Sequence, residues 1–125
     1  MLLPEYYDRL KVLVGDVPLN LIPPTFPFGG CVLNGSVVTD AHLDPMDYLL
    51  CLVMAFGNWA GAELVFYDLG LVSSAANGNI HVFTSTDQLH FNLHMDSGVR
   101  ASIVVRTDKD LKEWLKDRNG HPSAL

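Results

Sequence analysis

Short apolar runs separated by turn residues occupy most of the chain, and this pattern is typical of a β-rich protein. The runs are broken at Asn34-Gly35, Gly57-Asn58, Asn77-Gly78 and Asp96-Ser97-Gly98. We predict strands at residues 31–33, 37–42, 48–56, 62–67, 80–84, 90–95 and 99–107. Many short strands with regular turns indicate a β-sandwich, jelly roll or barrel. The run 48–56 is apolar at nearly every position, which favours a strand covered on both faces, with a buried helix as the alternative.

Helical spacing is found only near the two ends of the chain. Residues 4–14 predict a short helix that Gly15 ends, and a second helix is predicted from Asp108, as its N-cap, to about residue 118. The side chains expected on one face are Tyr6, Tyr7, Leu10 and Leu13 in the first helix and Leu111, Trp114 and Leu115 in the second. The proline-rich stretch 18–30 is predicted to be an extended loop.

Composition adds limits on size, compartment and partners. A chain of 125 residues with 49% apolar content predicts a single domain over residues 1–125, with a β core at about 31–107. No signal peptide or membrane-spanning run is present, so we expect a cytoplasmic or nuclear protein with no membrane partner. The net charge of −6 disfavours charge-driven nucleic-acid binding. Cys31 and Cys51 are predicted to be reduced and buried, with a disulfide as the alternative.

The tripeptide His42-Leu43-Asp44 is the strongest candidate for chemistry. On a strand, alternate residues share a face, so His42 and Asp44 are predicted to point the same way. Two imidazoles and one carboxylate form the ligand set of a facial non-haem Fe(II) site. His90 is the preferred third ligand because Arg100 follows it by ten residues, and His81 and His94 are the alternatives.

Arg100 and Ser102 form a second candidate group, on one face of the last predicted strand. An arginine can hold a carboxylate through two parallel hydrogen bonds, and a serine can add a third. We predict that this strand pairs with the strand of His90 across a tight turn, so that both groups lie in the mouth of a barrel. Asn92 shares the face of His90 and is a candidate for contact with a ligand or the substrate. Each of these short motifs is common by itself, and their order and spacing favour a functional site.

These residues together resemble the Fe(II)/2-oxoglutarate-dependent dioxygenases, which are built on a double-stranded β-helix. The matching segments are His42-Leu43-Asp44, residues 61–64, residues 78–83, His90 and Arg100-Ala101-Ser102, and the resemblance spans about residues 33–114. Within this superfamily the chain is most similar to fungal TET/JBP-like oxygenases, through a His42-x-Asp44-x-x-Asp47 pattern and residues 56–64.

The resemblance implies a role for each site residue. His42, Asp44 and His90 would bind Fe(II), and Arg100 and Ser102 would bind the cosubstrate 2-oxoglutarate. With O2 as second cosubstrate, a C–H bond of the substrate is oxidised and succinate and CO2 are released. The TET/JBP likeness implies a methylated base, flipped out of a duplex, as substrate.

Three features of the chain depart from the family pattern. Asn79 stands where an acidic residue is usual, and Gly61-Ala62 stands where a pair of glycines is usual. Only 41 residues precede His42, so we expect an N-terminally minimal version of the domain.

The substrate class stays open between a nucleobase, a protein side chain and a small metabolite. The alternative function is a non-catalytic jelly-roll module that binds a metal or ligand, and the ligand spacing does not suit a cupin-type enzyme.

Overall fold

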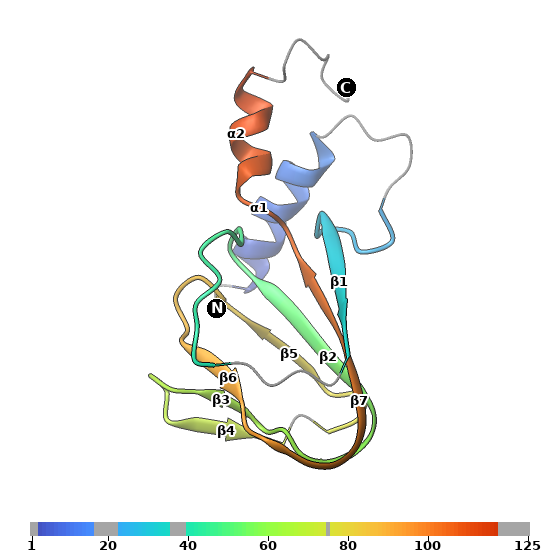
Figure 1. Ribbon diagram of the computed structural model, residues 1–125. Helices are drawn as coiled ribbons and strands as arrows, with labels where there is room; N and C mark the ends of the chain where they lie inside the picture. Colours follow the sequence, from blue (N-terminus) through green and yellow to red (C-terminus); the bar gives the residue numbers. More distant parts are fainter. Residues whose placement is uncertain (1–2, 17–22, 36–39, 75, 118–125) are drawn as a thin grey trace.

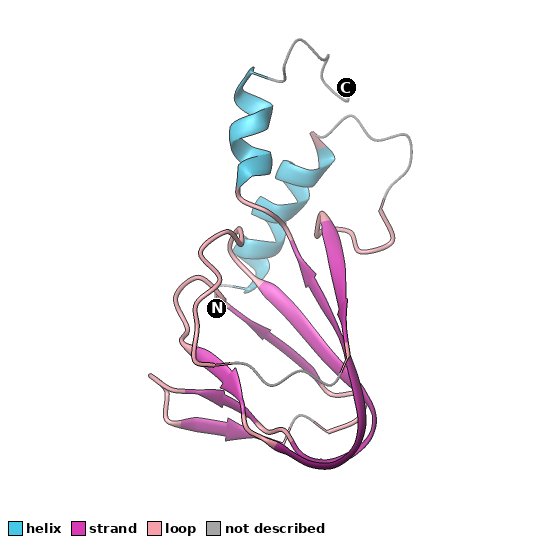
Figure 2. Cartoon of the chain, in the orientation of Figure 1, coloured by secondary structure: helices cyan, strands magenta, loops and turns pink. Residues whose placement is uncertain are grey.

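The protein is mainly β, with two antiparallel sheets and two short helices (Figures 1 and 2). The computed structural model describes residues 3–16, 23–35, 40–74 and 76–117. The larger sheet has the order β1 (Gly30–Asn34), β7 (Met95–Arg106), β2 (Cys51–Gly61) and β5 (Ile80–Phe83). The smaller sheet has the order β4 (Leu71–Ser73), β3 (Leu64–Phe66) and β6 (His90–Asn92). The helices are α1 (Leu3–Gly15) and α2 (Asp110–Asp117). This is the predicted double-stranded β-helix class of fold.

Strands β2 and β7 are the two long central strands of the larger sheet. They pair from Leu52 opposite Val105 to Gly61 opposite Met95, and they curve together toward the smaller sheet (Figure 1). Glycine is needed where they bend, because Gly57 has φ +131° and Gly98 has φ +96°. A Cβ atom at either position would also collide with the backbone of the opposite strand. The bend thus lets one long pair of strands form a wall of the cavity described below.

Helix α1 packs on the outer face of the larger sheet. Leu10 is 1% exposed and joins Phe28 and Leu50 in a core cluster, against which Leu52 and Val105 also pack. Because side chains alternate along a strand, the odd-numbered residues of β2 from Cys51 to Ala55 point to the other side of the sheet and line a cavity. The larger sheet is therefore covered on both faces at β2, by α1 on one face and by the cavity layer on the other.

The predicted strands agree with the structure in most places, and the differences have local causes. Residues 48–50 are not part of the strand, since Leu49 adopts φ +65° and β2 begins only at Cys51. The predicted turn at 96–98 is wrong because these residues lie inside β7, where the pairing with β2 has a register shift at Asp96 and the strand bends at Gly98. Strand β4 was not predicted. Residues 37–39 of one predicted strand lie outside the described residues, as do 18–22 of the predicted loop.

Three smaller predictions, on residues 48–56, on the first helix and on the cysteines, differ from the structure. The buried-helix alternative for 48–56 is wrong, since β2 is a strand. The face predicted for α1 is right only in part, because Leu10 and Leu13 are buried together with Val14, whereas Tyr7 is 47% exposed. Both cysteines are free thiols, but Cys31 is exposed because β1 lies at the edge of its sheet, so its predicted burial is wrong. None of the helices in the described ranges is long and apolar enough to cross a membrane.

Candidate metal centre

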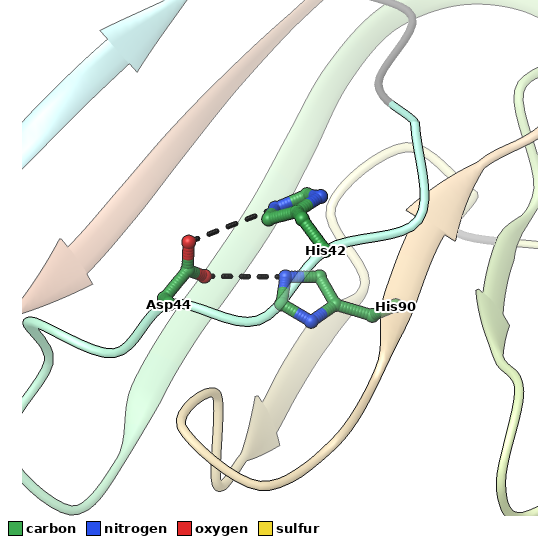
Figure 3. Close-up of side chains that lie close together, drawn as sticks. All are labelled: His42, Asp44 and His90. Atoms are coloured by element: carbon green, nitrogen blue, oxygen red, sulfur yellow. Dashed lines mark ion pairs between the residues drawn. The ribbon is translucent and has the colours of Figure 1, made fainter.

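His42, Asp44 and His90 lie together, with one ligand atom from each within 4.8 Å of the others (Figure 3). The two oxygens of the Asp44 carboxylate face different imidazoles. His90 Nε2 lies 3.2 Å from Oδ2, and His42 Nε2 lies 3.6 Å from Oδ1. The imidazole rings are tilted against each other with centroids 4.3 Å apart. Two nitrogens and a carboxylate thus converge on one point.

A pair of backbone hydrogen bonds brings the two histidines together. The amide of His42 donates to the carbonyl of His90 at 3.1 Å, and the amide of His90 donates back at 3.1 Å. This is an isolated antiparallel bridge at the start of β6, and it puts both side chains on the same side of the pair. The prediction that His42 and Asp44 share a face therefore agrees with the structure, although Asp44 lies in a loop.

A hydrogen bond at Nδ1 of each imidazole fixes the position of one ring hydrogen. His42 Nδ1 lies 2.7 Å from the carbonyl oxygen of Asp40, and His90 Nδ1 lies 2.8 Å from that of Gln88. A carbonyl oxygen only accepts, so each Nδ1 carries a hydrogen, and each ring turns its Nε2 toward Asp44. With Nδ1 protonated, Nε2 meets the carboxylate either through its own proton or through a metal ion that its lone pair binds. The donor set and the fixed tautomers fit a divalent metal.

Neither of the two alternative histidines belongs to the cluster, although His81 lines the same cavity. His81 is on β5, where its Nε2 is 2.7 Å from the hydroxyl of Ser73 and burial lowers the pKa of its imidazole. His94 is exposed in the link between β6 and β7. The structure thus brings His90, and neither alternative, to the His42 and Asp44 pair.

Arg100 and Ser102 lie on β7 and face a cavity of about 380 Å³ that His42, Asp44 and His90 also line. Arg100 is 5% exposed and Ser102 4%. Burial lowers the pKa of the Arg100 guanidinium, which lies 5.7 Å from the centre of the Trp59 ring. A guanidinium stays charged at neutral pH even so, and in this dry setting it attracts an anion more strongly than it would in water.

The predicted pairing of β7 with the His90 strand is wrong. Strand β7 pairs with β1 and β2, with Arg100 opposite Gly57, whereas β6 pairs with β3. The two strands belong to different sheets, and side chains from both line the cavity. The arginine group and the metal ligands therefore meet because the two sheets face each other across the cavity, and not because their strands pair.

The metal ligands and the arginine differ in their exposure. The side chains of His42 and Asp44 are each 38% exposed, and that of His90 is 8% exposed. The candidate centre is therefore open to solvent on one side, with Arg100 and Ser102 buried. Asn92 also lines the cavity, as predicted, and its amide nitrogen is 3.3 Å from the carbonyl of Ala62.

Sequence reasoning missed a polar cluster beside the centre, formed by the buried Asp47 and Ser85 and the half-buried Arg106. The Ser85 hydroxyl donates to Asp47 Oδ2 at 2.6 Å, and Arg106 Nε donates to Asp47 Oδ1. Burial alone would lower the pKa of Arg106, but the hydrogen bond and charge of Asp47 raise it. The only signal in the sequence was the position of Asp47 three residues after Asp44.

Comparison with known proteins gives the fold and no more. Neither a protein-family model nor a curated protein sequence matches the chain. Among solved structures, the chain is similar to NgTET1 in complex with 5mC DNA, with a TM-score of 0.71 and 17% sequence identity. The match covers 90% of this chain and 50% of the NgTET1 chain, so this chain spans about half the length of that structure.

Proposed function

We propose that the protein is an Fe(II)- and 2-oxoglutarate-dependent dioxygenase. The observation that carries the proposal is the pair of imidazoles that turn their Nε2 atoms toward Asp44 beside a cavity with a buried arginine. The likeness of the fold to NgTET1 supports the proposal, and so does the resemblance of the sequence to TET/JBP-like oxygenases.

Each side chain has a specific task in this proposal. His42, Asp44 and His90 would hold the metal, and a set of three protein ligands would leave it able to bind the cosubstrate and O2 as well. When bound, Fe(II) and 2-oxoglutarate supply the oxidative chemistry that removes hydrogen from a substrate C–H bond. The hydrogen bonds from Nδ1 to the carbonyls of Asp40 and Gln88 keep both rings in the tautomer that can bind metal.

The inner part of the cavity is proposed to hold 2-oxoglutarate. Arg100 binds the carboxylate that lies far from the metal, and the hydroxyl of Ser102 donates to the same group. Val53, Leu64 and Phe83 supply apolar walls that keep water from this ion pair.

For the primary substrate, a methylated nucleobase is the first candidate. The likeness to a protein solved in complex with 5mC DNA supports it. The net charge of −6 opposes tight, charge-driven binding of a nucleic-acid strand, whether single or double, so a free methylated base or nucleoside is also a candidate. A protein side chain or a small metabolite is the second candidate.

Anaerobic loading of the purified protein tests the function. Addition of 2-oxoglutarate to the Fe(II) protein should produce a weak visible charge-transfer band, and calorimetry should show 2-oxoglutarate binding that depends on the metal. Absence of both the band and the binding would refute the proposal.

The alternative function is a metal-binding jelly-roll module without turnover. The shared fold and the cluster of three metal-binding side chains are equally compatible with a module that holds a metal and does not turn over. Release of succinate under air, with no primary substrate added, would show turnover and exclude this alternative.

A further inference from the structure

We propose that Asp47 is a positioning residue for Asp44, the carboxylate ligand of the proposed metal centre. In this role Asp47 holds the turn of residues 44–47 against both Ser85 and Arg106, so that Asp44 faces the two imidazoles. This inference rests on the proposed metal site and assigns a task to a residue outside the ligand set.

The turn between Asp44 and Asp47 is anchored at both ends by one residue, Ser85. The amide of Asp44 donates to the carbonyl of Ser85 at 2.9 Å, and the Ser85 hydroxyl donates to Asp47 Oδ2 at 2.6 Å. Inside the turn, the amide of Asp47 donates to the carbonyl of Asp44 at 3.1 Å. Ser85 is 0% exposed, so this anchor is shielded from water.

Arg106 supplies the second anchor, from the far end of β7. Its Nε donates to Asp47 Oδ1, across 59 positions of the sequence. The same strand carries Ser102 and Arg100 on its cavity face. Asp47 thus ties the turn that carries the metal ligand to the strand that carries the proposed 2-oxoglutarate clamp.

The contacts of Asp47 favour positioning over direct contact with the substrate. Both of its carboxylate oxygens already accept hydrogen bonds, and its side chain is 3% exposed, whereas the Asp44 side chain is 38% exposed. A buried carboxylate with both oxygens satisfied is rigid. A metal ligand must be held to within about 0.5 Å of its productive position, which an exposed loop side chain achieves only if its backbone is fixed.

The test compares Asp47→Asn with Asp108→Asn. The asparagine side chain has one acceptor oxygen where aspartate has two, and it has no negative charge to balance that of Arg106. Asp47→Asn should therefore loosen the turn. Asp108 is the matched control, because its Oδ2 lies 3.6 Å from Arg106 Nη2 while its side chain is 47% exposed and lies outside the turn. In Asp108→Asn the remaining side-chain oxygen can still accept from the amide of Asp110.

Mn(II) binding is the readout, measured by calorimetry and by the electron paramagnetic resonance spectrum of the bound ion. Both are recorded below the unfolding temperature of each variant. Asp47→Asn should weaken Mn(II) binding by about 10-fold or more, the range for residues that orient metal ligands, and change the spectrum. Asp108→Asn should stay within about twofold of the wild type.

A lower unfolding temperature of Asp47→Asn, with Mn(II) affinity and spectrum unchanged, would overturn the proposal, since Asp47 would then be only structural. If Asp47→Asn does not fold, Ser85→Ala decides. It removes one hydrogen bond to Asp47 and keeps the carbonyl that holds Asp44, so about threefold weaker binding supports the proposal and unchanged binding overturns it. A wild-type protein that binds no Mn(II) would instead refute the proposed function.

Discussion

The two sides of the cavity hold their functional groups in different ways. On the metal side, one isolated bridge joins His42 to His90, and Asp44 lies in a loop with its side chain 38% exposed. On the opposite side, Arg100 and Ser102 lie on a strand that pairs with β1 and β2 and leaves each of them 5% exposed or less. The ligand side depends on a few specific hydrogen bonds, while the arginine side depends on the register of a whole sheet.

This difference has a consequence for the free energy of unfolding. His42 and Asp44 are half-exposed and have local anchors, so their loss should affect the metal far more than the fold. Groups inside the larger sheet are buried among apolar neighbours, so a change there should affect both ligand binding and stability. Substitutions on the two sides can test whether the division is real.

The largest expected effect is on the metal side. His42→Ala removes one of three proposed ligands and should weaken metal binding by more than about 100-fold, beyond the range for residues that only orient ligands. The unfolding temperature of the metal-free protein should change little, because the His42 side chain is 38% exposed. Calorimetry with Mn(II) measures the first quantity and thermal unfolding the second.

His94→Ala is the matched control for this prediction, since His94 is exposed and lies outside the cluster. It should bind Mn(II) as the wild type does. Equal Mn(II) affinity of His42→Ala and His94→Ala would remove His42 from the ligand set and contradict the division between the two sides.

The second effect is on the arginine side. Arg100→Ala should leave Mn(II) binding within about twofold and weaken 2-oxoglutarate binding by about 2–5 kcal/mol, the scale for truncating one partner of a buried charge pair. Calorimetry with the Mn(II) protein measures both. Arg9→Ala is the control, because Arg9 lies on α1 and contacts the Tyr48 ring at 5.9 Å, away from the cavity. An equal loss of metal and 2-oxoglutarate affinity in Arg100→Ala would show that the two sides are not independent.

The same comparison shows which features could be predicted from the sequence. The shared face of Arg100 and Ser102 follows from the two-residue period of a strand, which is local to β7. His42 and Asp44 do lie together, but Asp44 is in a loop, so the strand period predicted the right neighbours for a reason that the fold does not use. The partner of β7 could not be predicted, because β-strand register between distant segments depends on the whole fold. The contact of Asp47 with Arg106 spans 59 positions and leaves no periodic signal, so it also needed the structure.

The smallest expected effect concerns Cys51, on the cavity face of β2. Burial raises the pKa of its thiol from 9.0 to about 12, because a thiolate is poorly solvated there. Between these two values the unfolded chain releases a proton that the folded chain keeps, so stability should fall as pH rises above about 9. The slope attributable to one group is at most about 1.4 kcal/mol per pH unit.

Urea unfolding between pH 8 and about pH 10.5 measures this slope, and Cys51→Ala is expected to flatten it. Cys31→Ala is the matched control, since Cys31 is exposed at the edge of the same sheet and its removal should leave the slope unchanged. If Cys51→Ala kept the full slope, the thiol would be solvated in the folded protein. Water would then reach the cavity face of the larger sheet, as it reaches the metal side. Of the contrast in burial between the two sides, only the burial of Arg100 and Ser102 would remain.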